Sequence, residues 1–418
     1  MKPIEFTEFD LENGLHCIVH EQHSAPIVTL DMWYHVGSKN EEQTRTGFAH
    51  LFEHLMFQGS KHVGKTEHFS YVQEAGGTLN GSTNFDRTNY YETLPANQLD
   101  LALWLEADRM MSLNVNEENF ENQRSVVIEE RRQRYDNAPY GRVYEELHKR
   151  AYSAHPYRWI PIGSIEHLQA ATLDDVQRFF KTFYAPNNAT LVVSGDVSVK
   201  DVREKIITYF ADIPRNGDVP RPKNEDLPLT EEIRDTFYDN TELPAIFMAY
   251  RICNATSPDA DVLDIISMIL SDGRSSRLYR TLVHERRLAQ SVSTHASANE
   301  HDGLFHISLI APQTTPLSEL EKHFDEELQK IVEGDVTEYE LEKAKNTAEM
   351  HLTRLFSNNF GIADSLAYFH TFFKNADELN REFERVESVS LDDVRRVAKK
   401  YFGEKHRVVL HWLPRSMK

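Results

Sequence analysis

Hydrophobic residues between positions 48 and 56 recur at the spacing of one helix face. They stand at i, i+3, i+4, i+7 and i+8 and are Phe48, Leu51, Phe52, Leu55 and Met56. This spacing predicts an amphipathic helix whose apolar side packs against a core. Longer helical patterns run from about residue 97 to residue 150 and predict further helices.

Runs rich in β-branched and aromatic residues predict strands elsewhere in the chain. LENGLHCIVHE contains the Asn13-Gly14 hairpin signal, and the runs after Pro26 and Pro244 have the composition of strands. GGTLNGSTNFDRTNYYETLP, residues 76–95, predicts two short strands around a polar turn. Because strands come first and helices follow in groups, we expect an α+β fold, with mostly antiparallel sheets and helices packed on one face.

The two halves of the chain share this pattern at a constant distance. TLDDVQRFFKTFYAPNNATLVVSGDV from Thr172 matches SLDDVRRVAKKYFGEKHRVVLHWLP from Ser390, a helix and then a strand, at an offset of 218 (390 − 172). Pro26 and Pro244 are also separated by 218 positions (244 − 26), which indicates a duplication. The proline-rich residues 211–229 show no apolar periodicity and predict a linker.

We therefore expect two homologous domains, residues 1–213 and residues 229–418, joined by a linker at residues 214–228. The chain has 418 residues, 40% hydrophobic and 27% charged, which is enough for a core in each half. No run approaches the roughly 18 apolar residues of a membrane helix, and the start MKPIEFTEFDLENG lacks the order of a secretion signal. The expected protein is soluble, and cytoplasmic, or periplasmic if a signal peptide has been removed.

Composition narrows the possible classes of function. The formal net charge is −20, from 46 basic and 66 acidic residues, which disfavours nucleic acid as a partner and weakly favours basic peptides. Cys17 and Cys253 both lie in apolar runs and indicate buried small side chains rather than disulfides or thiolate metal ligands. The sequence contains no glycine-rich nucleotide loop and no activated serine or cysteine constellation.

The polar side of the first predicted helix carries a candidate metal site. His50 and His54 are one turn apart, so two imidazole nitrogens can converge on one ion. Glu53 lies beside them and is placed to take a proton from a water molecule on that ion. Catalytic zinc commonly takes two histidines and one carboxylate. In NQRSVVIEERRQRYDN, Glu129 and Glu130 are both candidates for the third ligand, and spacing alone does not choose between them.

HLFEH at residues 50–54, followed by a glutamate in VVIEERRQ, resembles the pitrilysin family of zinc metallopeptidases with the inverted H-x-x-E-H motif, which includes the β subunit of mitochondrial processing peptidase and bacterial relatives. The resemblance covers the whole chain and includes GGTLNGSTNFDRTNYY and LSDGRSSRLYR. It implies a third ligand 76 positions after the second histidine, which selects Glu130 (54 + 76). It further implies that His50, His54 and Glu130 ligate Zn²⁺ and that Glu53 is the catalytic base.

What the resemblance implies about function is a zinc-dependent endopeptidase that hydrolyses short or unfolded peptides. GGTLNGST resembles the edge strand with which the family binds the substrate backbone, so the substrate-binding candidates are Asn80, Gly81, Ser82 and Thr83. A plain turn at Asn80-Gly81 is the alternative for that segment. The alternative for the whole chain is a non-catalytic structural or assembly subunit with the same fold, against which the intact motif argues.

Some positions depart from the family pattern. Gln123 stands where some relatives carry a glutamate, seven positions before the third ligand. Val283 and Gln290 stand where single-chain members carry an arginine and a tyrosine that reach the substrate. The second half also lacks H-x-x-E-H, so we expect it to be a non-catalytic repeat. The expected assembly is a dimer, either of identical chains or with a related subunit that lacks the zinc motif and supplies the missing pair.

Overall fold

Two β-sheets organise the chain in the computed structural model, which describes residues 2–223 and 225–418. Each sheet is the centre of one structural unit. Unit 1 consists of Met1–Arg131, Trp159–Lys223 and Arg354–Asn380. Unit 2 consists of Arg132–Arg158, Asn224–Thr353 and Arg381–Lys418. Each half of the sequence thus supplies most of one unit and one segment of the other.

The sheet of unit 1 has six strands in the order β1-β2-β6-β3-β5-β4. They are β1 (Thr7–Asp10), β2 (His16–Glu21), β3 (Ile27–Tyr34), β4 (Thr78–Thr83), β5 (Thr88–Pro95) and β6 (Ala189–Gly195). Neighbouring strands are antiparallel except for β2 and β6, which are parallel. Gly14, between β1 and β2, has a φ of +89°, a conformation that glycine adopts readily, and the predicted hairpin is confirmed.

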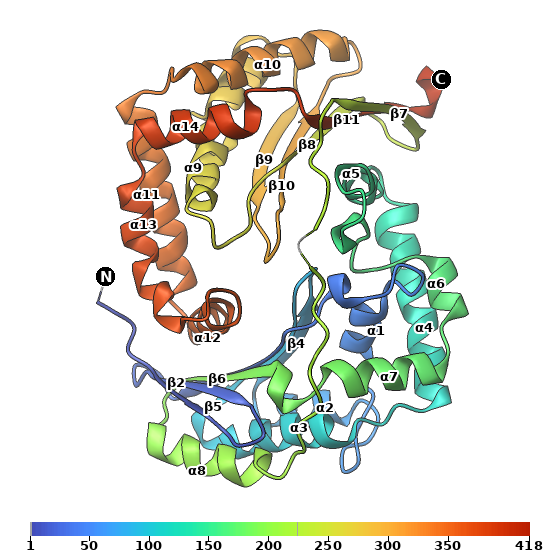
Figure 1. Ribbon diagram of the computed structural model, residues 1–418, viewed down its shortest axis with the longest axis vertical. Coiled ribbons are helices and arrows are strands. Elements are labelled where there is room, and N and C mark those ends of the chain that lie inside the picture. The colour runs from blue at the N-terminus through green and yellow to red at the C-terminus, as the bar shows by residue number, and fades with distance from the viewer. Residues whose placement is uncertain (1, 224) are drawn as a thin grey trace. The chain divides into compact units, whose positions relative to one another are not determined.

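Helices cover both faces of this sheet. The helices of unit 1 are α1 (Phe48–Leu55), α2 (Glu67–Glu74), α3 (Leu99–Ser112), α4 (Glu117–Arg131), α6 (Ile165–Ala170), α7 (Leu173–Phe183), α8 (Val199–Phe210) and α12 (Asn359–Tyr368). Successive strand residues point to opposite faces. Tyr90 contacts Arg109 of α3 on one face, whereas Tyr91 stacks on Phe360 of α12 on the other. The second half of the chain therefore supplies a helix, α12, that packs against β3 and β6 (Figure 1).

The sheet of unit 2 has five strands in the order β7-β11-β8-β10-β9. They are β7 (Ile233–Asp239), β8 (Ala245–Arg251), β9 (Ser291–Ser297), β10 (Leu304–Ile310) and β11 (Arg407–Pro414). Only β7 and β11 are parallel to each other. Its helices are α5 (Val143–Ala151), α9 (Asp259–Ser271), α10 (Leu317–Glu333), most of α11 (Glu338–Leu355), α13 (Glu382–Ser388) and α14 (Leu391–Phe402).

Helices from both halves of the sequence also cover the sheet of unit 2. On β10, Phe305 packs on Phe402 of α14, while the next residue, His306, stacks on Tyr144 of α5. Helix α5 comes from the first half of the sequence and lies against β8 and β11 (Figure 1). Each half of the sequence therefore contributes one helix to the sheet that the other half forms: α5 to the sheet of unit 2 and α12 to the sheet of unit 1.

Five strands of the first sheet, β2-β6-β3-β5-β4, follow the same order as β7-β11-β8-β10-β9 of the second, as expected of a duplicated chain, and β1 is an addition at the edge of the first sheet. Strands β6 and β11 begin 218 residues apart (407 − 189), and so do β3 and β8 (245 − 27). The described residues between 214 and 232 form neither helix nor strand. The two units are not simply the parts of the chain before and after this linker. Residues 132–158 precede the linker but belong to unit 2, and residues 354–380 follow it but belong to unit 1.

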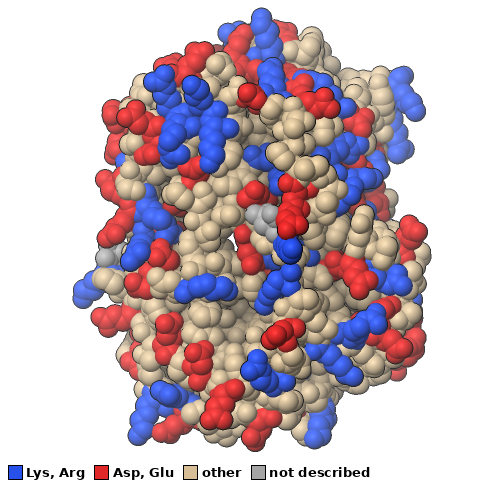
Figure 2. All heavy atoms as spheres, in the orientation of Figure 1, with Lys and Arg blue, Asp and Glu red and all other residues tan. Residues whose placement is uncertain are grey.

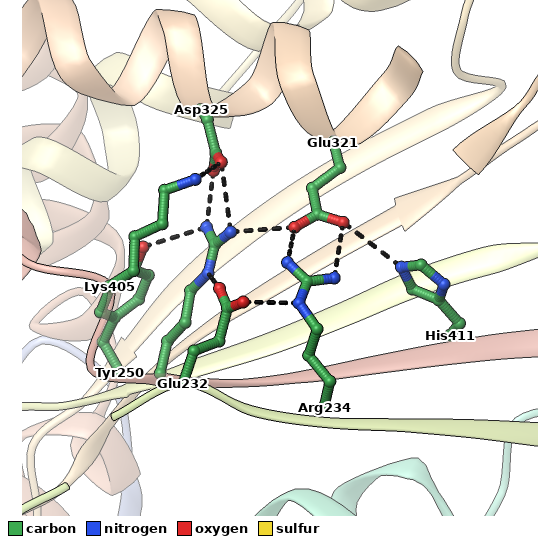
Figure 3. Close-up of polar contacts among 8 residues, drawn as sticks. Glu232, Arg234, Tyr250, Glu321, Asp325, Lys405 and His411 are labelled. Atoms are coloured by element: carbon green, nitrogen blue, oxygen red, sulfur yellow. Dashed lines mark hydrogen bonds and ion pairs between the residues drawn. The ribbon is translucent and has the colours of Figure 1, made fainter. Parts of the chain in front are cut away.

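A cluster of ion pairs joins strands and a helix of unit 2 (Figure 3). Arg407 on β11 is fully buried and binds the carboxylates of Glu232, Glu321 and Asp325. Arg234 on β7 also binds Glu321, which belongs to α10. Because a buried guanidinium needs compensating charges nearby, these contacts hold α10 against β7 and β11.

The acidic excess of the sequence is not gathered into one area on the face drawn in Figure 2. Acidic and basic side chains alternate over that face although the formal net charge is −20. Within the described part of the chain, no helix combines the length and the hydropathy that crossing a membrane requires.

Candidate metal centre

Helix α1 has two different sides, as its sequence spacing predicts. Its buried side includes Phe48, Leu51, Phe52 and Leu55. Its partly exposed side carries His50, Glu53 and His54. Phe52 stacks on Phe179 and Tyr184, with ring centres 5.3 and 5.1 Å apart, so the apolar side fastens the helix to unit 1. The packing of the apolar side therefore fixes the direction in which His50, Glu53 and His54 point.

Helix α4 brings Glu130 to the two histidines. Its Oε2 atom lies 3.7 Å from Nε2 of His50 and 3.3 Å from Nε2 of His54. The centres of the two imidazole rings are 4.8 Å apart, and their planes are inclined by 72°. These three residues thus offer ligand atoms that all lie within 4.8 Å of one another.

This donor set fits a zinc ion. Ligand atoms bound at about 2.0–2.2 Å to a tetrahedral zinc stand roughly 3.3–3.6 Å apart, close to the nitrogen–oxygen distances of 3.3 and 3.7 Å found here. Two imidazoles and one carboxylate are also a usual ligand set of catalytic zinc, with a fourth position left for water. The side chains of His50, His54 and Glu130 are 13, 23 and 17% exposed, so solvent reaches them.

Of the two adjacent glutamates on α4, Glu130 is the one beside the histidines. Glu129 is exposed. Neighbouring residues on a helix point about 100° apart, so only one of the pair can face α1. The packing of α4 on α1 therefore places Glu130, and not Glu129, beside the two histidines.

Glu53 lies next to the candidate ligand His54 and forms a hydrogen bond with Thr83, the last residue of β4. Burial raises the pKa of its carboxyl, while a hydrogen bond from Thr83 and the charges of His54 and Arg87 lower it. The net result is a pKa above the ordinary value for glutamate.

Strand β4 forms the edge of its sheet beside α1 (Figure 1). Among the described strands it pairs only with β5, so its other edge has backbone groups that can bind an extended peptide. A side-chain carbon added at Gly81 would lie 3.3 Å from Cγ of Glu53 and 3.2 Å from Tyr90. The substrate-binding candidates Asn80, Gly81, Ser82 and Thr83 are the last four residues of β4. Asn80-Gly81 therefore lies in a strand, and the plain turn is excluded.

Sequence reasoning did not single out Arg87, which lies in the turn between β4 and β5. Its guanidinium donates to the main-chain oxygen of Ser82 at 2.8 Å and to Oδ1 of Asn89 at 3.1 Å. It also lies over the ring of Trp33, 5.2 Å from the ring centre. Arg87 thus holds the end of β4 in place. An arginine in a polar turn is usually solvated, so its position in NFDRT carried no signal.

The residues that depart from the family pattern lie in different surroundings. Gln123 is buried on α4. In unit 2, Val283 is part of the π-helix Tyr279–Glu285, and Gln290 is exposed immediately before β9. Val283 has no polar group and Gln290 is a neutral amide, so neither carries the charge or the phenol of the residues it replaces.

Two family models match the chain. The model described as "Insulinase (Peptidase family M16)" matches residues 17–160, and the model described as "Peptidase M16 inactive domain" matches residues 170–348. The chain belongs to peptidase family M16. The first match contains the H-x-x-E-H helix and Glu130, whereas the second match covers much of the half without that motif.

Individual M16 relatives match nearly the whole chain. The zinc protease PqqE of Helicobacter pylori is 31% identical over 401 residues, which cover 94% of this chain and 89% of the relative. A probable mitochondrial-processing peptidase subunit beta of Arabidopsis thaliana is 23% identical and covers 94% and 76%, respectively. The crystal structure of a protease from Helicobacter pylori has a TM-score of 0.95 at 29% identity and covers 99% of this chain and 100% of that chain.

These M16 matches bear on the expectations drawn from the sequence. The family resemblance and the α+β architecture are confirmed. Relatives named as zinc proteases support membership of a protease family that uses zinc.

Proposed function

We propose that this chain is a zinc-dependent endopeptidase that hydrolyses short or unfolded peptides. The observation that carries the proposal is the convergence of His50, His54 and Glu130, from two separate helices, next to Glu53. The names of the M16 relatives support the same reaction. A purely structural subunit would not need these four side chains together, and no observation favours that alternative.

The chain's own residues divide the chemistry between them. His50, His54 and Glu130 would hold the zinc ion, which when bound lowers the pKa of a water molecule from about 16 towards about 7 and polarises a carbonyl group. Glu53 accepts a proton from the water molecule that adds to the scissile carbonyl carbon. It then delivers a proton to the amine nitrogen as the carbon–nitrogen bond breaks.

Strand β4 supplies the binding of the peptide. Its edge pairs with the peptide backbone as an added strand, through main-chain groups of residues 80–83. Gly81 leaves room for this approach, because any side chain there would press on Glu53. Main-chain groups are the same in every peptide, so this mode of binding tolerates many substrate sequences.

The test is to strip the metal from the purified protein, add zinc back and follow cleavage of a quenched fluorescent peptide. We expect activity to return with about one equivalent of zinc per chain, and Glu53→Gln to lose at least about 100-fold in kcat. Wild-type activity in Glu53→Gln would show that the assignment of the base is wrong. No cleavage by the wild-type chain, alone or with any related subunit, would favour the structural alternative.

We further propose that residues 229–418 are a non-catalytic repeat and that the working enzyme has two subunits. Val283 and Gln290 lack the groups that single-chain family members use at the substrate. A second subunit, either a copy of this chain or a relative without the zinc motif, would supply them. The subunit name of the mitochondrial relatives supports such an assembly. Full peptidase activity from a monomer, with its mass measured by light scattering, would contradict it.

A further inference from the structure

Helix α1 begins without a capping side chain of its own. Its first flanking residue, Gly47, has a φ of +96°, and no side chain caps the helix at that position. A side-chain carbon at Gly47 would lie 2.9 Å from the main-chain oxygen of Ile162 and 3.0 Å from Leu168. Serine, threonine and aspartate, the usual caps, therefore do not fit there. The first N–H groups of α1 need an acceptor from elsewhere.

Glu41 supplies that acceptor from six residues upstream. Its Oε2 accepts from the main-chain N–H of Gly47 at 3.0 Å, and its Oε1 accepts from the N–H of Ala49 at 2.8 Å. Trp159 Nε1 also donates to Oε2, at 3.1 Å. The residue is only 7% exposed. A carboxylate in this place also interacts favourably with the positive end of the helix dipole.

The segment that holds Glu41 also touches the helix of the third candidate ligand. Trp159 binds Glu41, and four residues later the main-chain oxygen of Gly163 accepts a hydrogen bond from Arg131. Arg131 is the neighbour of Glu130 at the end of α4. Gly163 packs so closely on Gly47 that an added side-chain carbon would lie 2.3 Å from the nitrogen of Gly47. Residues 159–163 thus contact the starting point of α1 and the end of α4.

We propose that Glu41 is a positioning residue of the candidate metal centre, which fixes the start of α1 and thereby the orientation of His50 and His54 toward Glu130. This inference rests on the proposed function. Glu41 acts through the helix, because its carboxyl group is bound to the main chain of α1 and to Trp159.

Glu41 can accept the hydrogen bonds at the start of α1 in either protonation state, whereas its interaction with the helix dipole requires the ionised form. Burial raises the pKa of its carboxyl to about 8, while hydrogen bonds from Ala49, Gly47 and Trp159 lower it. Both oxygens of a carboxyl group retain acceptor capacity in either state. A glutamine differs, because its NH₂ group can donate but cannot accept a hydrogen bond. In either orientation of the amide, this NH₂ group would face an N–H donor at the start of α1.

The experiment compares Glu41→Gln with Glu42→Gln, a matched control at the adjacent exposed glutamate. Zinc affinity is measured on metal-stripped protein by competition with a chromophoric chelator. Amide hydrogen exchange of residues 47–55 and the separate kcat and KM values for a quenched peptide complete the comparison. For Glu41→Gln we expect zinc binding about 10- to 100-fold weaker, faster exchange in α1, and a lower kcat with an unchanged KM. Glu42→Gln should match the wild type.

A second variant, Trp159→Phe, removes the indole N–H that donates to Glu41 and to the main-chain oxygen of Ser38, and it also shortens the side chain. It should weaken zinc binding in the same direction by about 10-fold or less. A folded Glu41→Gln protein with wild-type zinc affinity and wild-type exchange in α1 would overturn the inference. If Glu41→Gln does not fold, Trp159→Phe decides in the same way. If the wild-type protein did not bind zinc, the proposed function would be wrong. Amide hydrogen exchange in α1 would still test whether Glu41 fixes the start of that helix.

Discussion

Replacing Glu321 by glutamine removes one charge from the ion-pair cluster of unit 2 (Figure 3). The Glu321 carboxylate accepts hydrogen bonds from Arg234 at 3.0 Å, from Arg407 at 2.9 Å and from His411 at 3.3 Å. Burial raises the pKa of this carboxyl, but the hydrogen bonds from His411 and Arg234 and the charges of Arg234 and Arg407 bring it down to about 2. The folded state therefore strongly favours the ionised form.

The size of the effect follows from that pKa. Lowering the pKa from 4.5 to about 2 corresponds to about 3 kcal/mol of stabilisation at neutral pH. The Arg234 side chain is 44% exposed, and solvent screening reduces the expected loss to about 2 kcal/mol. Because the folded pKa lies below the unfolded one, this stabilisation is present above about pH 4.5 and disappears as the pH falls towards 2. At pH 3 about half of it should remain or less.

The assay is urea unfolding of Glu321→Gln at pH 7 and at pH 3. Unfolding is monitored by hydrogen exchange in peptides from α10 and β11, because these peptides report on unit 2 alone. Glu319→Gln, at an exposed position in the first turn of the same helix, is the control and should change stability by less than about 1 kcal/mol, the contribution of its charge to the helix dipole. A loss at pH 7 no larger than that of the control, or an equal loss at both pH values, would refute the reasoning.

Two further predictions concern the candidate metal centre. Glu130→Gln should weaken zinc binding by more than about 100-fold in chelator competition, since it removes a ligand rather than a supporting group. The neighbouring Glu129→Gln should leave zinc binding unchanged, and equal effects of the two would contradict the choice of Glu130. Gly81→Ala adds a carbon 3.3 Å from Cγ of Glu53 and should lower kcat about 10- to 100-fold in steady-state peptide cleavage. Gly217→Ala is its control, because the added carbon meets nothing within 4 Å. Equal kcat values for the two variants would show that a side chain at position 81 does not disturb Glu53.

Part of the site could be predicted because it depends on neighbours in the sequence. His50, Glu53 and His54 share one side of a helix through the 3.6-residue turn alone, and the apolar spacing of α1 says which side is buried. The strands that follow Pro26 and Pro244, and the 218-residue offset between the halves, are likewise readable from local composition and repetition. Periodicity is a local property, so it predicts local structure well.

Other features depend on contacts between residues that are far apart in the chain. Spacing could not choose between Glu129 and Glu130, since that choice follows from how α4 packs on α1, and only the family resemblance anticipated it. Glu41 shows no capping pattern in the sequence, because it accepts hydrogen bonds from Gly47 and Ala49, six and eight residues further along the chain, whereas a usual cap stands next to its helix. Arg87 looked like an ordinary turn residue for the same reason.

The sequence by itself determined the elements of this protein, its repeat and the motif on one helix face. Only the tertiary structure decided that residues 132–158 and 354–380 pack in the unit of the opposite half. A strand pattern shows how apolar side chains alternate, but it does not say which distant helix will cover them. Which helix covers which sheet depends on burying the apolar side chains of both sheet faces together. This burial involves segments from the whole chain, so no single segment predicts it.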